Sequence, residues 1–171
     1  MSGDVNTERG RAHVHAQTVE NLFDRIDTDQ NGFASEAELN VIKQRGGGLN
    51  SNEMASVRFM QDYMQTVSGL EKEKDAPNDG KGMGVSKEDL KTLKVVTDSN
   101  KDAKGDAAES DARSHALGSA WTWLTIPLSG PAVGAYKYFS EKGERNAHYD
   151  KAQATVDEAI TSGRNDRQRN R

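Results

Sequence analysis

Apolar side chains recur at helical spacing on both sides of a short polar run near the N-terminus. The stripe before the run follows an i, i+3, i+4, i+7 pattern, which gives a helix one apolar face. The stripe after the run ends where three consecutive glycines interrupt it. The apolar positions are Val19, Leu22, Phe23 and Ile26 before the run, and Leu39 and Ile42 after it. The pattern predicts a helix, a polar loop and a second helix.

Three further stretches carry apolar side chains at helical spacing. The first follows Ser51 or Asn52, either of which can cap the start of a helix. The second follows Ser86, whose spacing from Asp89 predicts a capping box, and the third ends at Gly163. The apolar positions are Met54, Val57, Met60, Tyr63, Met64 and Val67; Leu90, Leu93 and Val96; and Tyr149, Ala152, Val156, Ala159 and Ile160. The chain is therefore predicted to be all-α.

The polar run between the first two helices has an oxygen donor at each position that a calcium loop requires. Calcium binds about six to eight oxygens, and a twelve-residue loop supplies them from its first, third, fifth, seventh, ninth and twelfth positions. Gly32 stands at the sixth position, where the chain must turn sharply, and the Ser-x-x-Glu spacing at the end of the run predicts a capping box. The donors are Asp27, Asp29, Asn31, the backbone carbonyl of Phe33, Ser35 and Glu38.

This loop and its two helices resemble an EF-hand, most strongly over residues 19–42 and over residues 12–97 at most. The resemblance implies that the six donors bind Ca²⁺, with Ser35 acting directly or through water, and that the protein is a calcium sensor or buffer. Ala34 departs from the pattern at the eighth position, where EF-hands carry Ile, Leu or Val in a short β-bridge. The alternative is a solvated Asx-rich turn between two helices.

EF-hands come in pairs, because one helix–loop–helix unit cannot bury its apolar face alone. A second copy with Val85 at the eighth position would have Ser86 at the ninth and Asp89 at the twelfth. Its first, third and fifth positions would be Asn78, Gly80 and Gly82, and the two glycines have no donor side chain. The resemblance therefore implies an EF-hand pair over residues 12–97, with one intact hand and one degenerate hand that binds metal weakly or not at all.

Residues 98–112 contain no large apolar side chain, and two interpretations remain open for them. They form either an acidic linker or an extra calcium loop. The loop interpretation requires Ala103 at the sixth position, in a backbone conformation that costs about 1 kcal/mol without glycine. Its candidate ligands are Asp98, Asn100, Asp102, Asp106 and Glu109.

Residues 116–136 carry no formal charge, but Pro127 and Pro131 divide them into parts too short to cross a bilayer. Aromatic side chains lie near both ends of the segment Ala116–Phe139. Either they pack within a helical C-terminal region over residues 113–162, or the segment contacts a membrane surface or a protein partner. A third possibility is that the segment fills a methionine-rich groove and that calcium changes its exposure. The alternative function is an interaction or membrane-docking protein that uses the EF-hand as a scaffold.

Composition narrows the classes of protein further. The 171 residues include 29% charged and 33% hydrophobic side chains, which predicts one or two small domains with a modest core. Without cysteine the chain forms no disulfide and no thiolate metal site. The sequence has no phosphate-binding glycine loop, no His-Glu-x-x-His and no nucleophile elbow, so we expect that the protein is not an enzyme.

The two ends of the chain are polar. We expect residues 1–11 to be flexible and residues 163–171 to form a disordered basic tail. Nucleic-acid binding is not expected of that tail, because no aromatic side chains are interleaved with its arginines. The stretch Met1–Val19 has no apolar run of the kind that signal peptides carry, which predicts a cytoplasmic protein, with export by another route left open.

Overall fold

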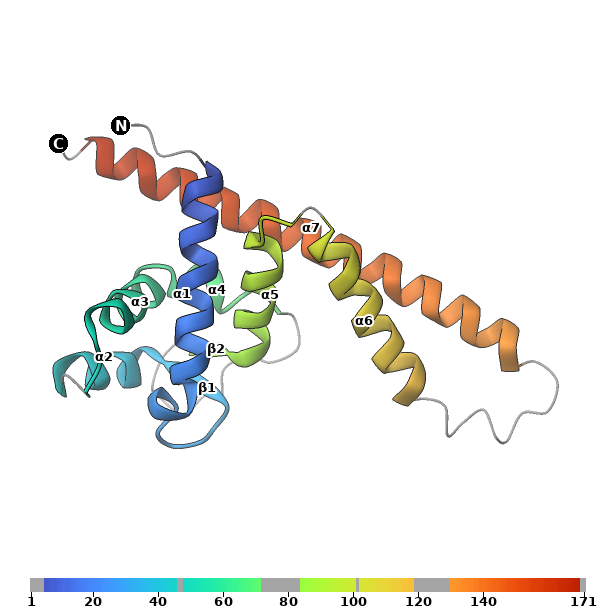
Figure 1. Ribbon diagram of the computed structural model, residues 1–171, viewed down its shortest axis with the longest axis horizontal. Helices are drawn as coiled ribbons and strands as arrows, with labels where there is room; N and C mark the ends of the chain where they lie inside the picture. Colours follow the sequence, from blue (N-terminus) through green and yellow to red (C-terminus); the bar gives the residue numbers. More distant parts are fainter. Residues whose placement is uncertain (1–4, 46–47, 72–83, 101, 119–129, 170–171) are drawn as a thin grey trace.

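The computed structural model describes residues 5–45, 48–71, 84–100, 102–118 and 130–169, and this part of the chain is mostly helical (Figure 1). It contains seven helices and one two-stranded antiparallel sheet, which confirms the predicted predominance of helix in these residues. The elements, in order, are α1 Val5–Ile26, β1 Phe33–Ser35, α2 Glu36–Arg45, α3 Ser51–Asp62, α4 Met64–Val67, β2 Gly84–Ser86, α5 Lys87–Thr97, α6 Ala103–Gly118 and α7 Gly130–Arg169.

Side-chain caps fix the starts of two helices. Ser86 caps α5 as predicted, in a capping box with Asp89. The cap of α3 is Asn50, so the prediction of Ser51 or Asn52 is one or two residues too late. The Asn50 side chain accepts from the backbone N–H groups of Asn52 and Glu53, and the Glu53 carboxylate accepts from the Asn50 N–H. Asparagine is among the strongest N-cap residues, and here it completes a capping box.

The short sheet joins two loops that are far apart in the sequence. Strands β1 and β2 pair antiparallel, with Ala34 opposite Val85, Phe33 opposite Ser86 and Ser35 opposite Gly84. Ala34 is fully buried, so the sheet forms with a methyl group where a larger side chain was expected. The strands hold two helix–loop–helix segments side by side, because each strand leads directly into a helix, β1 into α2 and β2 into α5.

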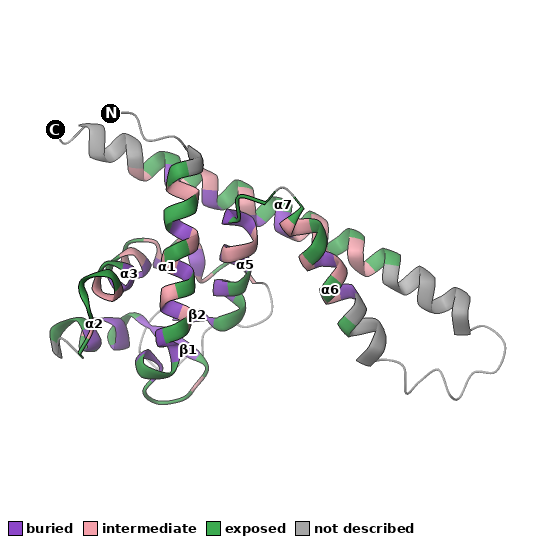
Figure 2. Ribbon diagram, in the orientation of Figure 1, coloured by how far each residue is buried: buried purple, intermediate pink, exposed green. Residues whose placement is uncertain are grey.

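One apolar core spans both halves of the chain. Helix α1 packs on α3 and α5, and α7 crosses α1, α4 and α5 (Figures 1 and 2). Val19, Phe23 and Ile26 of α1 and Leu93 of α5 share this core with α7, which contributes Tyr149, Ala152, Val156 and Ile160. The C-terminal helix is therefore part of the same packed unit as the N-terminal helices.

Helix extends further toward both ends of the described chain than the sequence predicted. Residues 5–11, expected to be flexible, belong to α1, whose stripe begins with the buried residues Ala12 and Ala16. Arg9 also forms an ion pair with Asp157 of α7. Helix α7 passes through Gly163 and ends at Arg169, so the prediction of a helix end at Gly163 is wrong, and residues 163–169 of the predicted tail are helical. A Cβ atom at Gly163 would lie 3.0 Å from the Tyr63 hydroxyl, so the glycine permits close packing.

The stretch 98–112 is not an extended linker, because α6 begins at Ala103. Asp98 and Asn100 use their side chains to form turns before that helix, by accepting from the backbone N–H groups of Asn100 and Asp102. Helix α6 and the N-terminal part of α7 then lie side by side and extend away from α1 to α5 (Figure 1).

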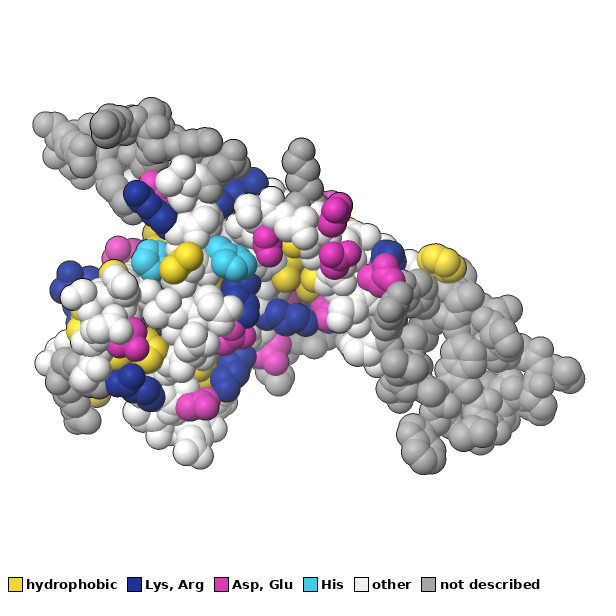
Figure 3. Space-filling view, in the orientation of Figure 1, with side chains coloured by type: hydrophobic (Ala, Val, Ile, Leu, Met, Phe, Trp, Pro, Cys, Tyr) yellow, Lys and Arg dark blue, Asp and Glu magenta, His cyan; other side chains and the backbone are white. Residues whose placement is uncertain are grey.

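The apolar segment Ala116–Phe139 falls largely outside the described residues or has undescribed side chains; Phe139 itself is exposed. Of the helices described, none is long and apolar enough to cross a membrane. Basic and acidic side chains are interspersed on the face shown in Figure 3, so the described residues there form no extended patch of positive charge.

Candidate metal centre

The segment Asp27–Glu38, called the first loop segment below, connects α1 to α2 through β1. The backbone N–H of Asp27 still donates to the Phe23 carbonyl at 2.8 Å, so α1 delivers the Asp27 carboxylate at a fixed position. The chain then turns through two residues with positive φ, Gln30 at 58° and Gly32 at 89°. Glycine adopts such a backbone without strain, which explains the sixth residue of the segment.

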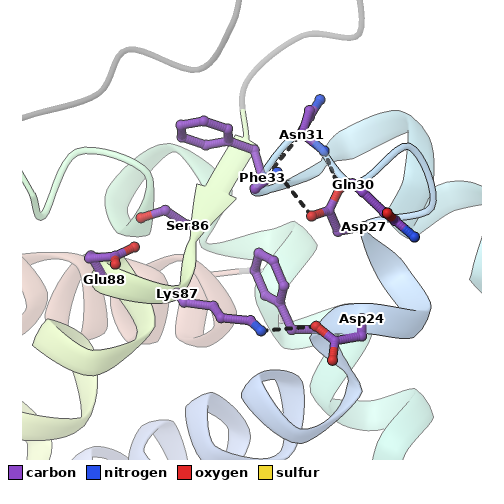
Figure 4. Close-up of a pocket in the computed structure, with 10 residues that line it drawn as sticks. Asp24, Asp27, Gln30, Asn31, Phe33, Ser86, Lys87 and Glu88 are labelled. Carbon is purple, nitrogen blue, oxygen red and sulfur yellow. Dashed lines mark hydrogen bonds and ion pairs between the residues drawn. The ribbon is translucent and has the colours of Figure 1, made fainter.

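The turn is folded around the carboxylate of Asp27. The Asn31 N–H donates to Asp27 Oδ1 at 3.1 Å, and the Gly32 N–H donates to Oδ2 at 2.9 Å (Figure 4). Asn31 in turn accepts from the Phe33 N–H at 2.9 Å and donates from its amide to Asp29 at 3.1 Å. These bonds gather the side chains of Asp27, Asp29 and Asn31 on the inside of one tight turn.

Glu38 closes the segment from the other side. Its Oε1 accepts from the Thr28 N–H at 2.8 Å, and its Oε2 accepts from the Ser35 N–H at 3.0 Å and the Ser35 hydroxyl at 2.7 Å. Burial alone would raise the pKa of Glu38, but the hydrogen bonds from Ser35 and Thr28 lower it below its usual value. These hydrogen bonds therefore favour the ionised form of the buried Glu38 carboxylate and fix its direction.

Three of the predicted ligands converge. One carboxylate oxygen from each of Asp27, Asp29 and Glu38 lies within 4.8 Å of the other two, and no other described residues form such an acidic group. Asp27 and Glu38 are only 7% and 6% exposed, whereas Asp29 is on the surface. Carboxylate oxygens are ligands of hard divalent cations, so this group can hold a metal ion.

The remaining predicted ligands lie in the same segment. Asn31 is within the turn, and Phe33 and Ser35 are the first and last residues of β1. The Ser35 hydroxyl donates to Glu38, and it also accepts from the Glu38 N–H at 3.3 Å, which completes the predicted capping box. In this arrangement Ser35 orients Glu38.

A cavity of about 590 Å³ opens beside the turn (Figure 4). Asp27, Asn31 and Gly32 line it on one side, and residues at the start of α5 line it on the other. Lys87 of α5 does not reach Asp27, because its ammonium pairs with Asp24 at 2.9 Å. Solvent therefore has access to the side of the turn on which Asp27 lies.

The residues described on either side of 72–83, which are 70–71 and 84–89, are called the second loop segment below, and they repeat part of this design. Asp89 accepts from the Ser86 N–H at 2.9 Å and the Ser86 hydroxyl at 2.8 Å, as Glu38 accepts from Ser35. Its other oxygen accepts from the Glu71 N–H at 3.0 Å, as Glu38 accepts from the N–H of Thr28. Burial raises the pKa of Asp89, although these hydrogen bonds act to lower it.

This correspondence identifies the counterpart of Asp27. Thr28 corresponds to Glu71, so Asp27 corresponds to Leu70, an apolar residue that is 4% exposed. The sequence from Leu70 to Asp89 is therefore longer than that from Asp27 to Glu38, and it has no carboxylate at its start. The predicted first, third and fifth positions, Asn78, Gly80 and Gly82, lie outside the described residues.

In the stretch that was left open as an acidic linker or an extra calcium loop, the described residues from Ala103 onward are helical. Helix α6 begins at Ala103, so Asp106 and Glu109 lie on a helix, and Glu109 forms an ion pair with Lys142 of α7 at 3.0 Å. None of the candidate ligands belongs to the converging acidic group of the described chain. They are Asp98, Asn100, Asp102, Asp106 and Glu109.

Comparisons of the chain with protein-family models, curated proteins and solved structures find no match.

The sequence did not point to two residues that organise the loop segments, Thr28 and Glu71. Thr28 binds Glu38 through its backbone N–H and, at 3.1 Å, through its hydroxyl. The sequence could have indicated the role of Thr28, because it is a polar residue directly after the first loop position. No local pattern indicates the role of Glu71, because its partners lie far away in the sequence.

Proposed function

We propose that this protein binds one calcium ion in the first loop segment and is a calcium-binding protein of the EF-hand type. The observation that carries the proposal is the convergence of Asp27, Asp29 and Glu38 within 4.8 Å. These residues stand at the first, third and twelfth positions of a loop whose sixth residue is a glycine with positive φ. That spacing of donors is the one that an EF-hand loop uses for calcium.

The donor set favours calcium over softer metals. All the candidate ligands are oxygens, and no cysteine occurs in the chain. Asp27, Asp29, Asn31 and the Phe33 carbonyl would supply one side of the site, and Glu38 would close it with both oxygens. Because the Ser35 hydroxyl already donates to Glu38, we expect a water molecule to complete the ninth position.

The second loop segment supports a paired arrangement with a single metal site. Its strand pairs with β1, and Ser86 and Asp89 match Ser35 and Glu38 in their hydrogen bonds. Its first position is the buried Leu70, which offers no side-chain oxygen. We therefore infer that the second hand is structural, and with three acidic ligands in the first we expect a calcium Kd on the order of 10⁻⁶–10⁻⁴ M.

Calorimetric calcium titrations of the intact chain, Glu38→Gln and Glu36→Gln test the proposal. Both variants remove one negative charge from the first turn of α2, but Glu38 is buried at the acidic group, whereas Glu36 is exposed. We expect Glu38→Gln to weaken binding by at least about tenfold and Glu36→Gln to leave Kd within about twofold. Absence of binding by the intact chain, or equal weakening in both variants, would contradict the proposal.

A further inference from the structure

Glu71 connects the second loop segment to the C-terminal helix. Its backbone N–H donates to Asp89, while its carboxylate accepts from the Thr92 hydroxyl on α5. The same carboxylate meets two residues of α7, with Oε1 2.9 Å from His148 Nε2 and Oε2 3.5 Å from Arg145 Nη1. The Glu71 side chain is only 17% exposed, so these contacts are shielded from solvent.

The residues of α7 that contact Glu71 are followed along the helix by residues that are buried or hydrogen-bonded. Tyr149, next to His148, is fully buried and donates to Asp111 of α6. Ala152 and Val156, one and two turns further along, belong to the common core. The polar contacts of His148 and Arg145 therefore lie at the edge of a firmly packed part of the helix, which is suited to hold Glu71 in one position.

The corresponding residue of the first loop segment is used differently. The Thr28 side chain turns inward and donates to Glu38, whereas the Glu71 side chain turns toward α7. In the first loop segment we propose that calcium balances the negative charge. In the second, the guanidinium of Arg145 forms an ion pair with Glu71, so a side chain of the protein supplies positive charge there.

A continuous set of contacts leads from Glu71 to the metal centre. Glu71 holds Asp89, and Asp89 holds both the N–H and the hydroxyl of Ser86. Ser86 is opposite Phe33 in the sheet, and β1 contains both Phe33 and Ser35. The position of β2 thus influences two residues of the first loop segment before any ion binds.

We propose that the contacts of Glu71 with His148 and Arg145 form a clamp through which α7 increases the calcium affinity of the first loop segment. This inference rests on the proposed function. The clamp holds β2, and thereby β1, in place. The first loop segment then loses less conformational entropy when calcium binds, which favours binding. By linkage, calcium binding strengthens the attachment of α7 to the second loop segment by the same factor.

Calcium titrations of Glu71→Gln and His148→Ala test the clamp, with Asp150→Asn as the matched control. Asp150 is also on α7, but it pairs with Lys104 of α6 and contacts neither loop segment through that pair. We expect Kd to rise about three- to tenfold in Glu71→Gln and His148→Ala and to stay within about twofold in Asp150→Asn. Circular dichroism verifies that each variant is folded. The His148→Ala variant is the milder of the two, because the Glu71 carboxylate keeps Thr92 and Arg145 as partners.

Amide hydrogen exchange gives a second readout, and its first part is made without calcium. In the calcium-free protein, both clamp variants should exchange faster than the intact chain around Glu71 and at residues 145–152, and calcium should slow exchange there in the intact chain. Normal calcium binding by the intact chain, with Kd unchanged in both clamp variants, would overturn the clamp and leave the proposed function standing. No calcium binding by the intact chain would overturn both.

Discussion

Replacement of Tyr149 by Phe removes a buried hydrogen bond between α7 and α6. Tyr149 is 1% exposed, and its hydroxyl donates to Asp111 Oδ2 at 2.8 Å. Phenylalanine keeps the packing of the ring, so the variant loses little except this bond. A hydrogen bond to a charged group contributes about 1.5–3 kcal/mol to stability. Lys91 still holds the other oxygen of Asp111, so we expect a loss of about 1–2 kcal/mol.

The loss should depend on pH through the charge of Asp111. Burial alone would raise the pKa of Asp111, but hydrogen bonds from Lys91 and Tyr149 lower it below its usual value. A carboxylate with a lowered folded-state pKa contributes stability that is present above its unfolded pKa of about 3.9 and is lost as the pH falls through the folded pKa. The Tyr149→Phe variant should therefore differ most from the intact chain near neutral pH.

Urea unfolding followed by circular dichroism measures the difference in stability near neutral pH and in acid, at about pH 3. A double-mutant cycle with Asp111→Asn assigns the loss to the pair, and the coupling energy should be about as large as the loss in Tyr149→Phe alone. Equal stability of the two proteins near neutral pH would refute the reasoning. A difference that stays undiminished where Asp111 is protonated would refute its electrostatic part.

Two further predictions follow from local geometry. Ser35→Ala removes the hydroxyl that caps α2 and orients Glu38, so the free energy of unfolding should fall by about 1 kcal/mol and calcium should bind more weakly; unchanged thermal stability would contradict this. Alanine at Gly143, which has open space around it, should stabilise α7 by about 0.5–1 kcal/mol. Alanine at Gly163 should stabilise the protein less or destabilise it, because its Cβ would lie 3.0 Å from the Tyr63 hydroxyl; equal gains in thermal unfolding would contradict this.

The local patterns of the sequence predict the acidic group and the helices around it well. The alternation of Asp27, Asp29 and Asn31 with a glycine at the sixth position concerns neighbours in the chain, so their convergence needs only one turn. The capping boxes at Ser35 and Ser86 are equally local, since each joins residues three apart. Features of this kind depend only on residues that are close together in the sequence.

The sequence predicts the packing of the chain ends poorly, because the contacts there are distant and use small residues. Ala12 and Ala16 are buried in α1, yet alanine counts little in an apolar stripe. Arg9 forms an ion pair with Asp157, although most of the chain separates these two residues in the sequence. In the sequence, Glu71 likewise looks like an ordinary surface residue. Its contact with His148 exists only in the folded chain. Residues 103–112 could equally have been part of an acidic loop, but they belong to α6, which packs on α7.

The number of calcium ions bound per chain tests the central claim most directly. A calorimetric titration of the intact protein, with chelator-treated buffers, gives this number together with Kd. The account predicts one ion per chain, because the carboxylates of Asp27, Asp29 and Glu38 converge and Leu70 occupies the corresponding start of the second loop segment. Zero ions would contradict the metal centre, and two would contradict the assignment of the second loop segment as a structural, metal-free hand.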